Sequence, residues 1–275
     1  MIEDLAQVRS LIRHGWEQVA TDYAQDRAGI FGRSAERLVE LLHPSPGSRL
    51  LDVGTGSGLV ARQAATWLGG EGKVLGCDFA AAMVYLAKQE TPGVVFCQMD
   101  AEHLGFPSAS FDSVACAFSL FQFPDMDRVL TEMWRVLEPG GRIGLSNWGP
   151  GYFSPIARLQ RDLFRGFGLR PLLTNPIAFK PDEIQSLLHR AAFTTVEVVE
   201  EAIEIWFEGP KEVWAFNLDM GPFPVMLQRQ LSAARRRELE QQYAAMLEPL
   251  KTEQGIGCKF HVLYALARKG GAGST

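Results

Sequence analysis

The chain has 275 residues, 47% of them hydrophobic, which is enough for one large domain or a domain with a modest cap. Its formal net charge is −5 at pH 7, which argues against nucleic acid or an anionic membrane as an obligate partner. The four cysteines form no C-x-x-C pair, and no run of about 18 residues is apolar and uncharged. We therefore expect a cytoplasmic protein with no bound metal, no disulfide framework and no membrane insertion.

Two helices are expected before the first strand. Over residues 2–20 the apolar positions recur at helical spacing, which predicts an amphipathic helix that must pack on another part of the molecule. A second helix is expected over 35–42, where the following His-Pro-Ser-Pro-Gly stretch at 43–47 provides a stop and a turn.

Strands and helices alternate from residue 46 to residue 148. The expected strands are the apolar runs RLLDVG, KVLGCDF, VVFCQMD, FDSVACAFS and RIGLSNW. The helices expected between them are GLVARQAATWLG, AAMVYLAKQE and DRVLTEMWRVL. Continuous apolar strands that alternate with helices are typical of a parallel sheet covered on both faces.

The alternation stops after Trp148. Residues 149–179 are rich in Gly, Pro and aromatic residues, and we expect them to form a lid segment. A helix is predicted over 181–193 and a strand over 194–207. Two helical pieces are then expected within residues 211–250 and a final strand over 257–269. The whole pattern predicts an α/β fold with seven strands.

Three glycines follow the first expected strand in the stretch LLDVGTGSG. Gly54, Gly56 and Gly58 stand at every second position, where the strand turns into a helix. Ligands of open parallel sheets bind at such turns, and residues without a Cβ let a ligand lie against the main chain. A nicotinamide dinucleotide would favour G-x-G-x-x-G, but the third glycine here comes one residue early.

Carboxylates end the next two strands. Asp78 is placed to accept hydrogen bonds from two ribose hydroxyls, as an acid does in nucleoside sites of this architecture. Asp100 can accept from an exocyclic amine, while the backbone of Ala101 can donate to the ring. The first loop offers no Lys or Arg for a phosphate, so an adenosine without phosphates fits best.

Five motifs in order carry a resemblance to a known family. They are LLDVGTGSG, CDFAAAMV, DAEHLGFP, FDSVACAFSLFQFPD and RVLEPGG. The series resembles the class I S-adenosylmethionine-dependent methyltransferases, and within these the small-molecule group that includes the ubiquinone and menaquinone biosynthesis enzymes. The resemblance covers residues 16–148. It implies a Rossmann-like, mostly parallel sheet of seven strands with the last strand antiparallel, helices on both faces, and S-adenosylmethionine as cofactor with S-adenosylhomocysteine as product.

The resemblance also suggests a division of the chain. N-terminal helices in 1–45 would cover the cofactor site, and 46–148 would form the core that binds S-adenosylmethionine. The lid segment 149–179 would follow. Residues 180–269 would complete the core sheet around a helical insertion at about 209–254, and 270–275 would form a flexible tail.

The family's cofactor-binding roles can be placed on matching positions. The glycine loop would approach the methionine and sugar portions, and Asp52 would orient that loop or meet the methionine ammonium. Aromatic and thioether side chains would pack on the adenine, while Tyr23 resembles the aromatic residue of the segment that closes over the cofactor. The implied cofactor-binding residues are Tyr23, Asp52, Gly54, Thr55, Gly56, Gly58, Asp78, Phe79, Met83, Asp100, Ala101 and Phe118.

The methyl acceptor is expected to be a hydrophobic or aromatic small molecule, methylated on carbon or oxygen, because the lid is rich in aromatic residues and poor in polar anchors. His14 is the candidate general base, if one is used. The family often has His after the fourth strand, where this chain has Ser-Leu-Phe-Gln-Phe at 119–123, so the quinone substrate and a His-based mechanism are not carried over. The candidate acceptor pocket consists of Trp16, Phe121, Trp148, Tyr152, Phe153 and Trp214.

Two alternatives remain open from the sequence. The glycine turn and Asp78 also suit an NAD-dependent oxidoreductase, although the glycine spacing and Asp100 oppose it. A non-catalytic protein that binds S-adenosylmethionine for regulation would carry the same cofactor motifs. The oxidoreductase should bind NAD(H) in place of S-adenosylhomocysteine, and the regulatory protein should bind the cofactor without methyl transfer.

Overall fold

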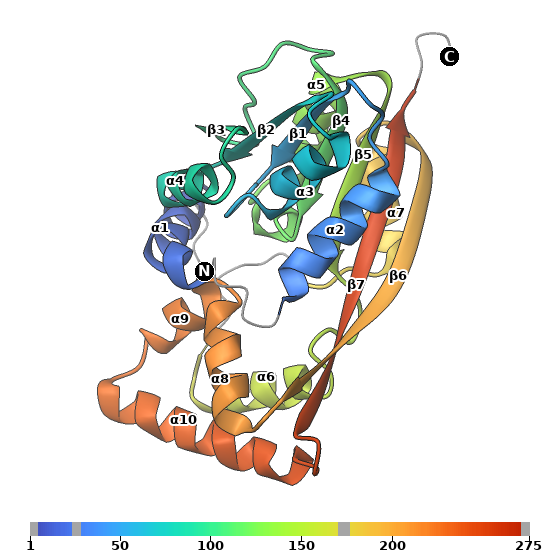
Figure 1. The fold of residues 1–275 in the computed structure, drawn as a ribbon. Helices are drawn as coiled ribbons and strands as arrows, with labels where there is room; N and C mark the ends of the chain where they lie inside the picture. Colours follow the sequence, from blue (N-terminus) through green and yellow to red (C-terminus); the bar gives the residue numbers. More distant parts are fainter. Residues whose placement is uncertain (1–4, 24–28, 170–176, 271–275) are drawn as a thin grey trace.

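A computed structural model describes residues 5–23, 29–169 and 177–270. Its described residues form a seven-stranded sheet of order β3-β2-β1-β4-β5-β7-β6 (Figure 1). β7 runs antiparallel to both of its neighbours, and the other paired strands are parallel, which confirms the predicted fold class. The strands are β1 (Arg49–Val53), β2 (Lys73–Asp78), β3 (Val95–Gln98), β4 (Phe111–Ala117), β5 (Leu137–Trp148), β6 (Phe193–Phe207) and β7 (Ile256–Lys269).

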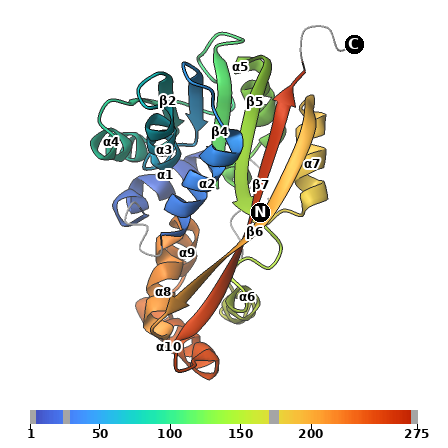
Figure 2. The same cartoon turned by 45° about the vertical axis from the view of Figure 1, so that its right-hand side comes forward.

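Helices cover both faces of this sheet. α2 and α3 pack together on one face, with α4 beside α3, while α5 and α7 pack together on the other (Figures 1 and 2). The helices are α1 (Leu5–Tyr23), α2 (Ile30–Leu42), α3 (Leu59–Leu68), α4 (Ala81–Glu90), α5 (Met126–Val136), α6 (Ile156–Gly166), α7 (Pro181–Arg190), α8 (Pro210–Asp219), α9 (Pro222–Gln228) and α10 (Ala233–Leu247), with short 3₁₀ turns at Leu120–Gln122 (η1) and Glu248–Leu250 (η2).

The central strands are mainly apolar because helices bury them from both sides. Leu50, Leu51 and Val53 of β1 are fully buried, as are Val114 and its neighbours in β4. The carboxyl ends of β1, β2, β3 and β4 reach the same edge of the sheet. The turn residues that follow these strands are therefore brought together.

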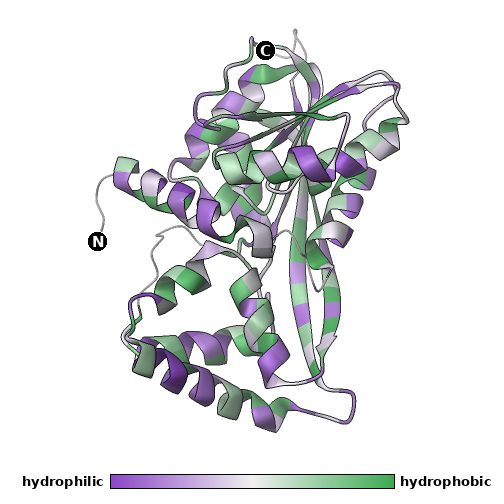
Figure 3. Ribbon diagram, turned by 60° about the vertical axis from the view of Figure 1, so that its left-hand side comes forward, coloured by the Kyte–Doolittle hydropathy of each residue, from purple (hydrophilic) through white to green (hydrophobic). Residues whose placement is uncertain are grey.

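β6 and β7 form a long two-stranded ribbon that extends beyond the core sheet, paired from Phe193–Lys269 to Phe207–Ile256. The residues between these strands form α8, α9, α10 and η2, and α6 packs on α10 (Figures 1 and 2). We call α6 together with residues 209–254 the cap. Figure 3 shows that its helices carry both hydrophilic and hydrophobic residues, as expected for helices that bury only one face.

Several predicted element boundaries were wrong. Residues 211–250 hold three α-helices rather than two helical pieces, because Gly221, with φ of 131°, and Pro222 end α8 and begin α9. The expected lid contains α6, which the Gly- and Pro-rich composition had hidden. α2 begins at Ile30, five residues earlier than expected, and it buries Ile30 and Phe31.

Some sequence-based expectations fall on residues that the structure does not describe. These are residues 1–4 and 24–28 of the N-terminal segment, 170–176 of the lid and 271–275 of the tail. Within the described residues, no helix is both long and apolar enough to cross a membrane.

Candidate cofactor site

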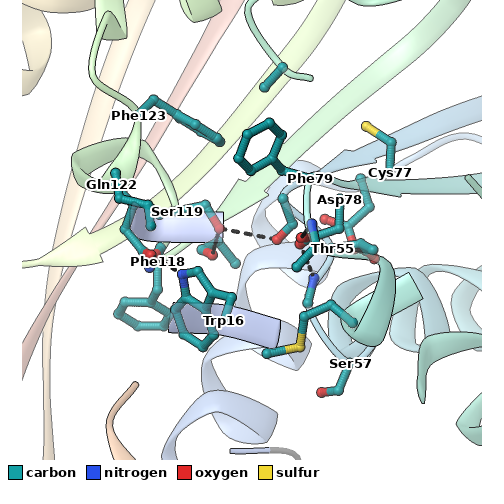
Figure 4. Close-up of a pocket in the computed structure, with 18 of the residues that line it drawn as sticks. Trp16, Thr55, Ser57, Cys77, Asp78, Phe79, Phe118, Ser119, Gln122 and Phe123 are labelled. Atoms are coloured by element: carbon teal, nitrogen blue, oxygen red, sulfur yellow. Dashed lines mark hydrogen bonds between the residues drawn. The ribbon is translucent and has the colours of Figure 1, made fainter. Parts of the chain in front are cut away.

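A pocket lies at the carboxyl ends of β1 to β4, beneath α1. Figure 4 shows Trp16 of α1 beside Phe118 and Gln122, with Asp78 and Thr55 on the opposite side of the pocket. The walls come from α1, the β1–α3 loop, the ends of β2 and β3, and the segment after β4. Segments that are far apart in the sequence thus meet at the edge where an open parallel sheet binds its ligands.

The three glycines of the β1–α3 loop have different tasks, although all have positive φ angles between 55° and 87°. A Cβ on Gly54 would lie 2.6 Å from Ser119 Oγ, so this glycine allows the segment after β4 to approach. A Cβ on Gly58 would lie 3.1 Å from Phe96, and Gly58 does not line the pocket. Of these three glycines, only Gly56 both lines the pocket and has free space beside it. A Cβ on Gly56 would have Tyr23, at 3.9 Å, as its nearest neighbour.

Asp52, the last but one residue of β1, is a buried carboxyl group that lines the pocket. Its Oδ2 accepts hydrogen bonds from Thr55 Oγ1 at 2.6 Å and from the Ala61 backbone N–H at 3.1 Å. Its Oδ1 is buried with no hydrogen-bond partner. Burial raises the pKa of Asp52 to about 7, and the Thr55 and Ala61 hydrogen bonds oppose this rise. The unpartnered oxygen can accept a hydrogen bond from a cationic group.

Asp78 is fixed by the main chain at the end of β2. Its Oδ2 accepts from the Gly56 N–H and its Oδ1 from the Ala80 N–H, both at 2.9 Å. Burial raises its pKa, against the effect of these hydrogen bonds. A carboxylate has about four lone-pair sites, so acceptor capacity remains for a ligand in the pocket.

A second acidic cluster follows β3. Asp100 Oδ1 accepts from the Glu102 backbone N–H at 2.9 Å, and both residues line the pocket together with Ala101. The buried Glu102 carboxylate forms an ion pair with Arg9 of α1. Burial raises the pKa of Glu102, and Arg9 opposes this rise. Asp100 therefore remains available to a ligand while Glu102 is held by the helix above it.

Among the described side chains of α1, Arg9, Ile12, Trp16 and Tyr23 line the pocket. They fall on one helical face because their spacings of three, four and seven residues return to the same side of an α-helix. Trp16 and Tyr23 were expected in the site, whereas Arg9 and Ile12 were missed. The same helical periodicity that predicted α1 would have found them once Trp16 and Tyr23 were placed in the site.

Phe118 directly follows β4 in an unusual backbone conformation, with φ of 49°, and it lines the pocket as the resemblance implied. Its ring contacts Phe31, which in turn contacts Tyr23. Phe31 of α2 is a pocket residue that sequence reasoning missed, because the predicted helix began after it. The positive φ of Phe118 is the kind of strain that proteins keep at functional sites.

The candidate acceptor residues separate into two groups. Trp16 lines the pocket, and its indole Nε1–H donates to Gln122 Oε1 at 2.5 Å. The others do not line it: Trp148 packs on Phe118, and Phe153 packs on Phe260. These aromatic side chains, from β5, η1, the segment between β5 and α6, and α8, belong to the hydrophobic core or pack against it. The candidates outside the pocket lining are Phe121, Trp148, Tyr152, Phe153 and Trp214.

His14 is exposed on α1 and does not line the pocket, so its placement gives no support to a role as general base. Among the described residues that line the pocket there is no histidine. Gln122, another residue that sequence reasoning did not assign, occupies the segment where the family often has His. Its Nε2 donates to the Phe118 carbonyl at 3.0 Å.

The remaining cofactor candidates, Thr55, Phe79, Met83 and Ala101, all lie in the pocket wall. Thr55 also donates its backbone N–H to the Cys77 carbonyl at 2.9 Å, which fixes the loop against β2. In the described part of the chain, no group of three or more His, Cys, Asp and Glu side chains is placed to hold a metal ion.

The charge of the pocket favours a cationic ligand. Its described lining contains four carboxyl groups and one guanidinium, which already pairs with one of those carboxyls. A pyrophosphate would be repelled by these acids and would find no free cation among the described lining residues. A ligand with a positively charged portion, a ribose and an adenine matches the arrangement.

Comparisons with known proteins agree with this geometry. A family model described as a methyltransferase domain matches residues 51–145. A demethylmenaquinone methyltransferase from Lactobacillus johnsonii is 30% identical over 68% of this chain and 77% of that protein. A nocamycin O-methyltransferase from Saccharothrix syringae is 38% identical over 48% of this chain and 49% of that protein. The chain thus spans about half the length of some curated relatives that it matches.

A solved structure shares the overall fold. The YcgJ protein of Bacillus subtilis superposes with a TM-score of 0.59 at 18% identity, over 86% of this chain and 98% of that one. Sheet order, pocket position and sequence similarity together define a Rossmann-like methyltransferase fold. The chain belongs to the class I S-adenosylmethionine-dependent methyltransferases, which confirms the family suggested by the five motifs.

Proposed function

We propose that this protein transfers a methyl group from S-adenosylmethionine to a carbon or oxygen atom of a hydrophobic or aromatic small molecule. One observation carries the proposal: open backbone at Gly56 and the carboxylates of Asp78 and Asp100 face one pocket beneath an aromatic helix. Family membership also favours this function over that of a nicotinamide-dependent oxidoreductase.

The pocket residues fit S-adenosylmethionine. The unpartnered Oδ1 of Asp52 would accept from the methionine ammonium, and the open face of Gly56 would take the adjoining chain. Asp78 would accept from the ribose hydroxyls with the lone pairs that Gly56 and Ala80 leave free. The contacts to Asp52 and Asp78 would give these carboxyl oxygens hydrogen-bond partners, and leaving such oxygens unpaired away from water costs free energy.

The adenine would lie at the ends of β2 and β3. Asp100 would accept from the exocyclic amine and the Ala101 N–H would donate to the ring, as the resemblance implies. Phe79 and Met83 would pack on the ring faces. Gly54 and Gly58 would act indirectly, by permitting the loop to pack against Ser119 and Phe96.

S-Adenosylmethionine supplies an activated methyl group on a cationic sulfonium. The protein's task in such a displacement is mainly to align the reacting groups and exclude water. The rings of Trp16, Tyr23 and Phe118 contribute an apolar wall with negative π faces, which stabilise a nearby cation. The hydrogen bond from Trp16 to Gln122 holds α1 over this part of the pocket.

The acceptor class follows from the walls away from the carboxylates. Ile12, Phe31, Phe118 and Phe123 make them apolar, with Gln122 as a polar anchor. The names of two relatives, a demethylmenaquinone methyltransferase and a nocamycin O-methyltransferase, support an apolar acceptor for this chain. Neither partnership with nucleic acid nor secretion is part of the proposal, since the net charge is −5 and all four cysteines are free thiols, as in a reducing cytoplasm.

Two measurements test the proposal. Calorimetry should show S-adenosylhomocysteine binding and no NAD⁺ binding, and the reverse result would contradict the cofactor assignment. Cell extract incubated with protein and isotopically labelled S-adenosylmethionine should yield a labelled apolar metabolite by mass spectrometry. Tight binding without transfer to any acceptor would instead support a non-catalytic regulatory protein.

A further inference from the structure

Helix α1 takes part in two interfaces at once. Figure 1 shows it between α4 of the core and α9 of the cap, and α1 packs against both. α9 lies in the insertion between β6 and β7, far from the cofactor motifs in sequence. The helix that covers the cofactor pocket is thus also a support for the cap.

Among the described residues, contacts beside three different strand ends tie α1 to the core. Arg9 pairs with Glu102 after β3, and Trp16 donates to Gln122 after β4 at 2.5 Å. Glu17 accepts from two backbone N–H groups in the first turn of α4, after β2, at 2.8 and 3.1 Å. A carboxylate at a helix N-terminus is favourable. α1 therefore crosses the entire cofactor side of the pocket.

On the cap side, Gly15 allows an unusually close approach. A Cβ at this position would lie 2.8 Å from Pro222 Cβ and 2.8 Å from Met226 Sδ, both in α9. Gly in a helix interior is normally less favourable than Ala. At Gly15 the absence of a side chain lets the two helices pack against each other.

The neighbouring residues extend the same interface. The Trp16 ring lies against the turn before α9, since a Cβ on Gly221 would be 3.1 Å from it. Gln18 accepts a hydrogen bond from Arg229 at the end of α9. Trp16 consequently contacts the cofactor pocket with one edge and the cap with another.

We propose that α1 couples cofactor binding to the position of the cap, with Gly15, Trp16 and Gln18 as positioning residues. A ligand that fixes α1 over the pocket also fixes α9, because the two helices pack without an intervening side chain at Gly15. By thermodynamic reciprocity, an acceptor that orders the cap tightens cofactor binding by the same factor, commonly about 5- to 150-fold for coupled sites. The inference rests on the proposed function for the identity of the ligand.

Hydrogen exchange of the full-length protein with and without saturating S-adenosylhomocysteine tests this coupling. We expect slower exchange in the glycine loop 54–58, in α1 and, about 5-fold or more, in residues 222–228 of α9. The exposed side of α10 should not change. Protection of the loop and α1 with no change in α9 would overturn the inference.

Variants then locate the coupling. Gly15→Leu should abolish the ligand-dependent protection of α9 while the protection of residues 54–58 persists. The matched control is Ser10→Leu, which places the same side chain on an exposed part of α1 and should behave like wild type. Gln18→Ala, at an exposed position, is the second variant should Gly15→Leu not fold, and it should at least halve the protection of α9. Unchanged α9 protection in a folded Gly15→Leu protein, or in Gln18→Ala, would refute the coupling.

Calorimetry separates this inference from the proposed function. If wild-type protein does not bind S-adenosylhomocysteine at all, the cofactor assignment fails. If it binds and only α9 is unresponsive, the cofactor assignment stands and the coupling is wrong.

Discussion

The cofactor pocket and the cap use their polar side chains differently. In the pocket, Asp52 and Asp78 accept backbone or hydroxyl hydrogens with some lone pairs and keep others free. In the cap, Gln160 donates to Asn217 at 3.0 Å and accepts from Tyr243 at 2.9 Å. These three side chains bond to one another, and Asn217 Nδ2 is the buried donor among them that has no partner. The pocket therefore offers free acceptors to a ligand, whereas the Gln160 and Asn217 side chains of the cap use their acceptors on other cap residues.

Truncating an aromatic residue between β5 and α6, outside the pocket, should separate the effect on stability from the effect on binding most strongly. Phe153 is buried and stacks on Phe260 at 5.2 Å, away from the pocket. Phe153→Ala should lower the free energy of unfolding by about 3–5 kcal/mol, because it leaves a cavity. Urea denaturation measures this loss, and the affinity of the folded protein for S-adenosylhomocysteine should stay unchanged.

The matched control is Phe31→Ala, because Phe31 is also buried but lines the pocket. This variant should lose both stability and affinity. Equal losses of affinity in the two variants would mean that Phe153 serves the ligand after all, and the contrast between the regions would fail.

A second comparison separates two costs of a side chain at Gly54, namely its left-handed backbone conformation and the contact with Ser119. Gly54→Ala places a Cβ 2.6 Å from Ser119 Oγ in a left-handed conformation. The conformation costs about 1–2 kcal/mol and the overlap about 1–3 kcal/mol more, so thermal or urea unfolding should show a loss of about 2–5 kcal/mol.

Gly69→Ala is the control for the conformational contribution. Gly69 has a similar φ of 57°, but a Cβ there would meet nothing within 4 Å. It should cost only about 1–2 kcal/mol. Equal effects at positions 54 and 69 would show that contact with Ser119 contributes little.

The carboxylates after β2 and β3 should affect binding more than folding. Asp78→Ala and Asp100→Ala should each weaken S-adenosylhomocysteine binding by about 1–3 kcal/mol, measured by calorimetry, because each removes a charge-assisted hydrogen bond. Asp78 should have the larger effect, since it also holds the Gly56 N–H. Asp112→Ala is the control: Asp112 pairs with Arg49 at the opposite end of the sheet, so its loss should leave affinity unchanged. Unaltered binding in both pocket variants would contradict the site assignment.

The contrast between the regions also explains which parts of the structure could be predicted from sequence. Strands such as RLLDVG are buried on both faces and read as apolar runs, and the residues after them lie at one sheet edge by topology alone. Asp78 and Asp100 could therefore be placed without coordinates. Helical periodicity places Arg9 on the face of α1 that Trp16 and Tyr23 share, but its ion pair with Glu102 depends on where α1 docks and could not be predicted.

Aromatic residues were harder to interpret for a physical reason. A Phe that lines a pocket and a Phe in the hydrophobic core look the same in the sequence, and only their contacts in the folded protein distinguish them. Phe153 and Trp214 were expected in the acceptor pocket, but they pack on Phe260 and Tyr243 instead. Gly58 presents the same difficulty, since its positive φ and its contact with Phe96 account for it without a ligand.

The buried carboxyl of Asp52 predicts a pH dependence of stability that the cap lacks. Its pKa is raised to about 7 by burial, whereas an unfolded Asp titrates near 3.9, as a rough reference value. Between these values the folded protein holds the extra proton, so stability falls as pH rises, by up to about 1.4 kcal/mol per pH unit, and levels off above pH 7. Urea unfolding at pH 5.5, 6.5 and 7.5 measures this slope.

Burial also raises the pKa of Asp78 and Glu102, so the decisive quantity is the difference in slope between wild type and Asp52→Asn, which should have the smaller slope. Identical slopes would show that Asp52 ionises at its ordinary pKa despite its burial.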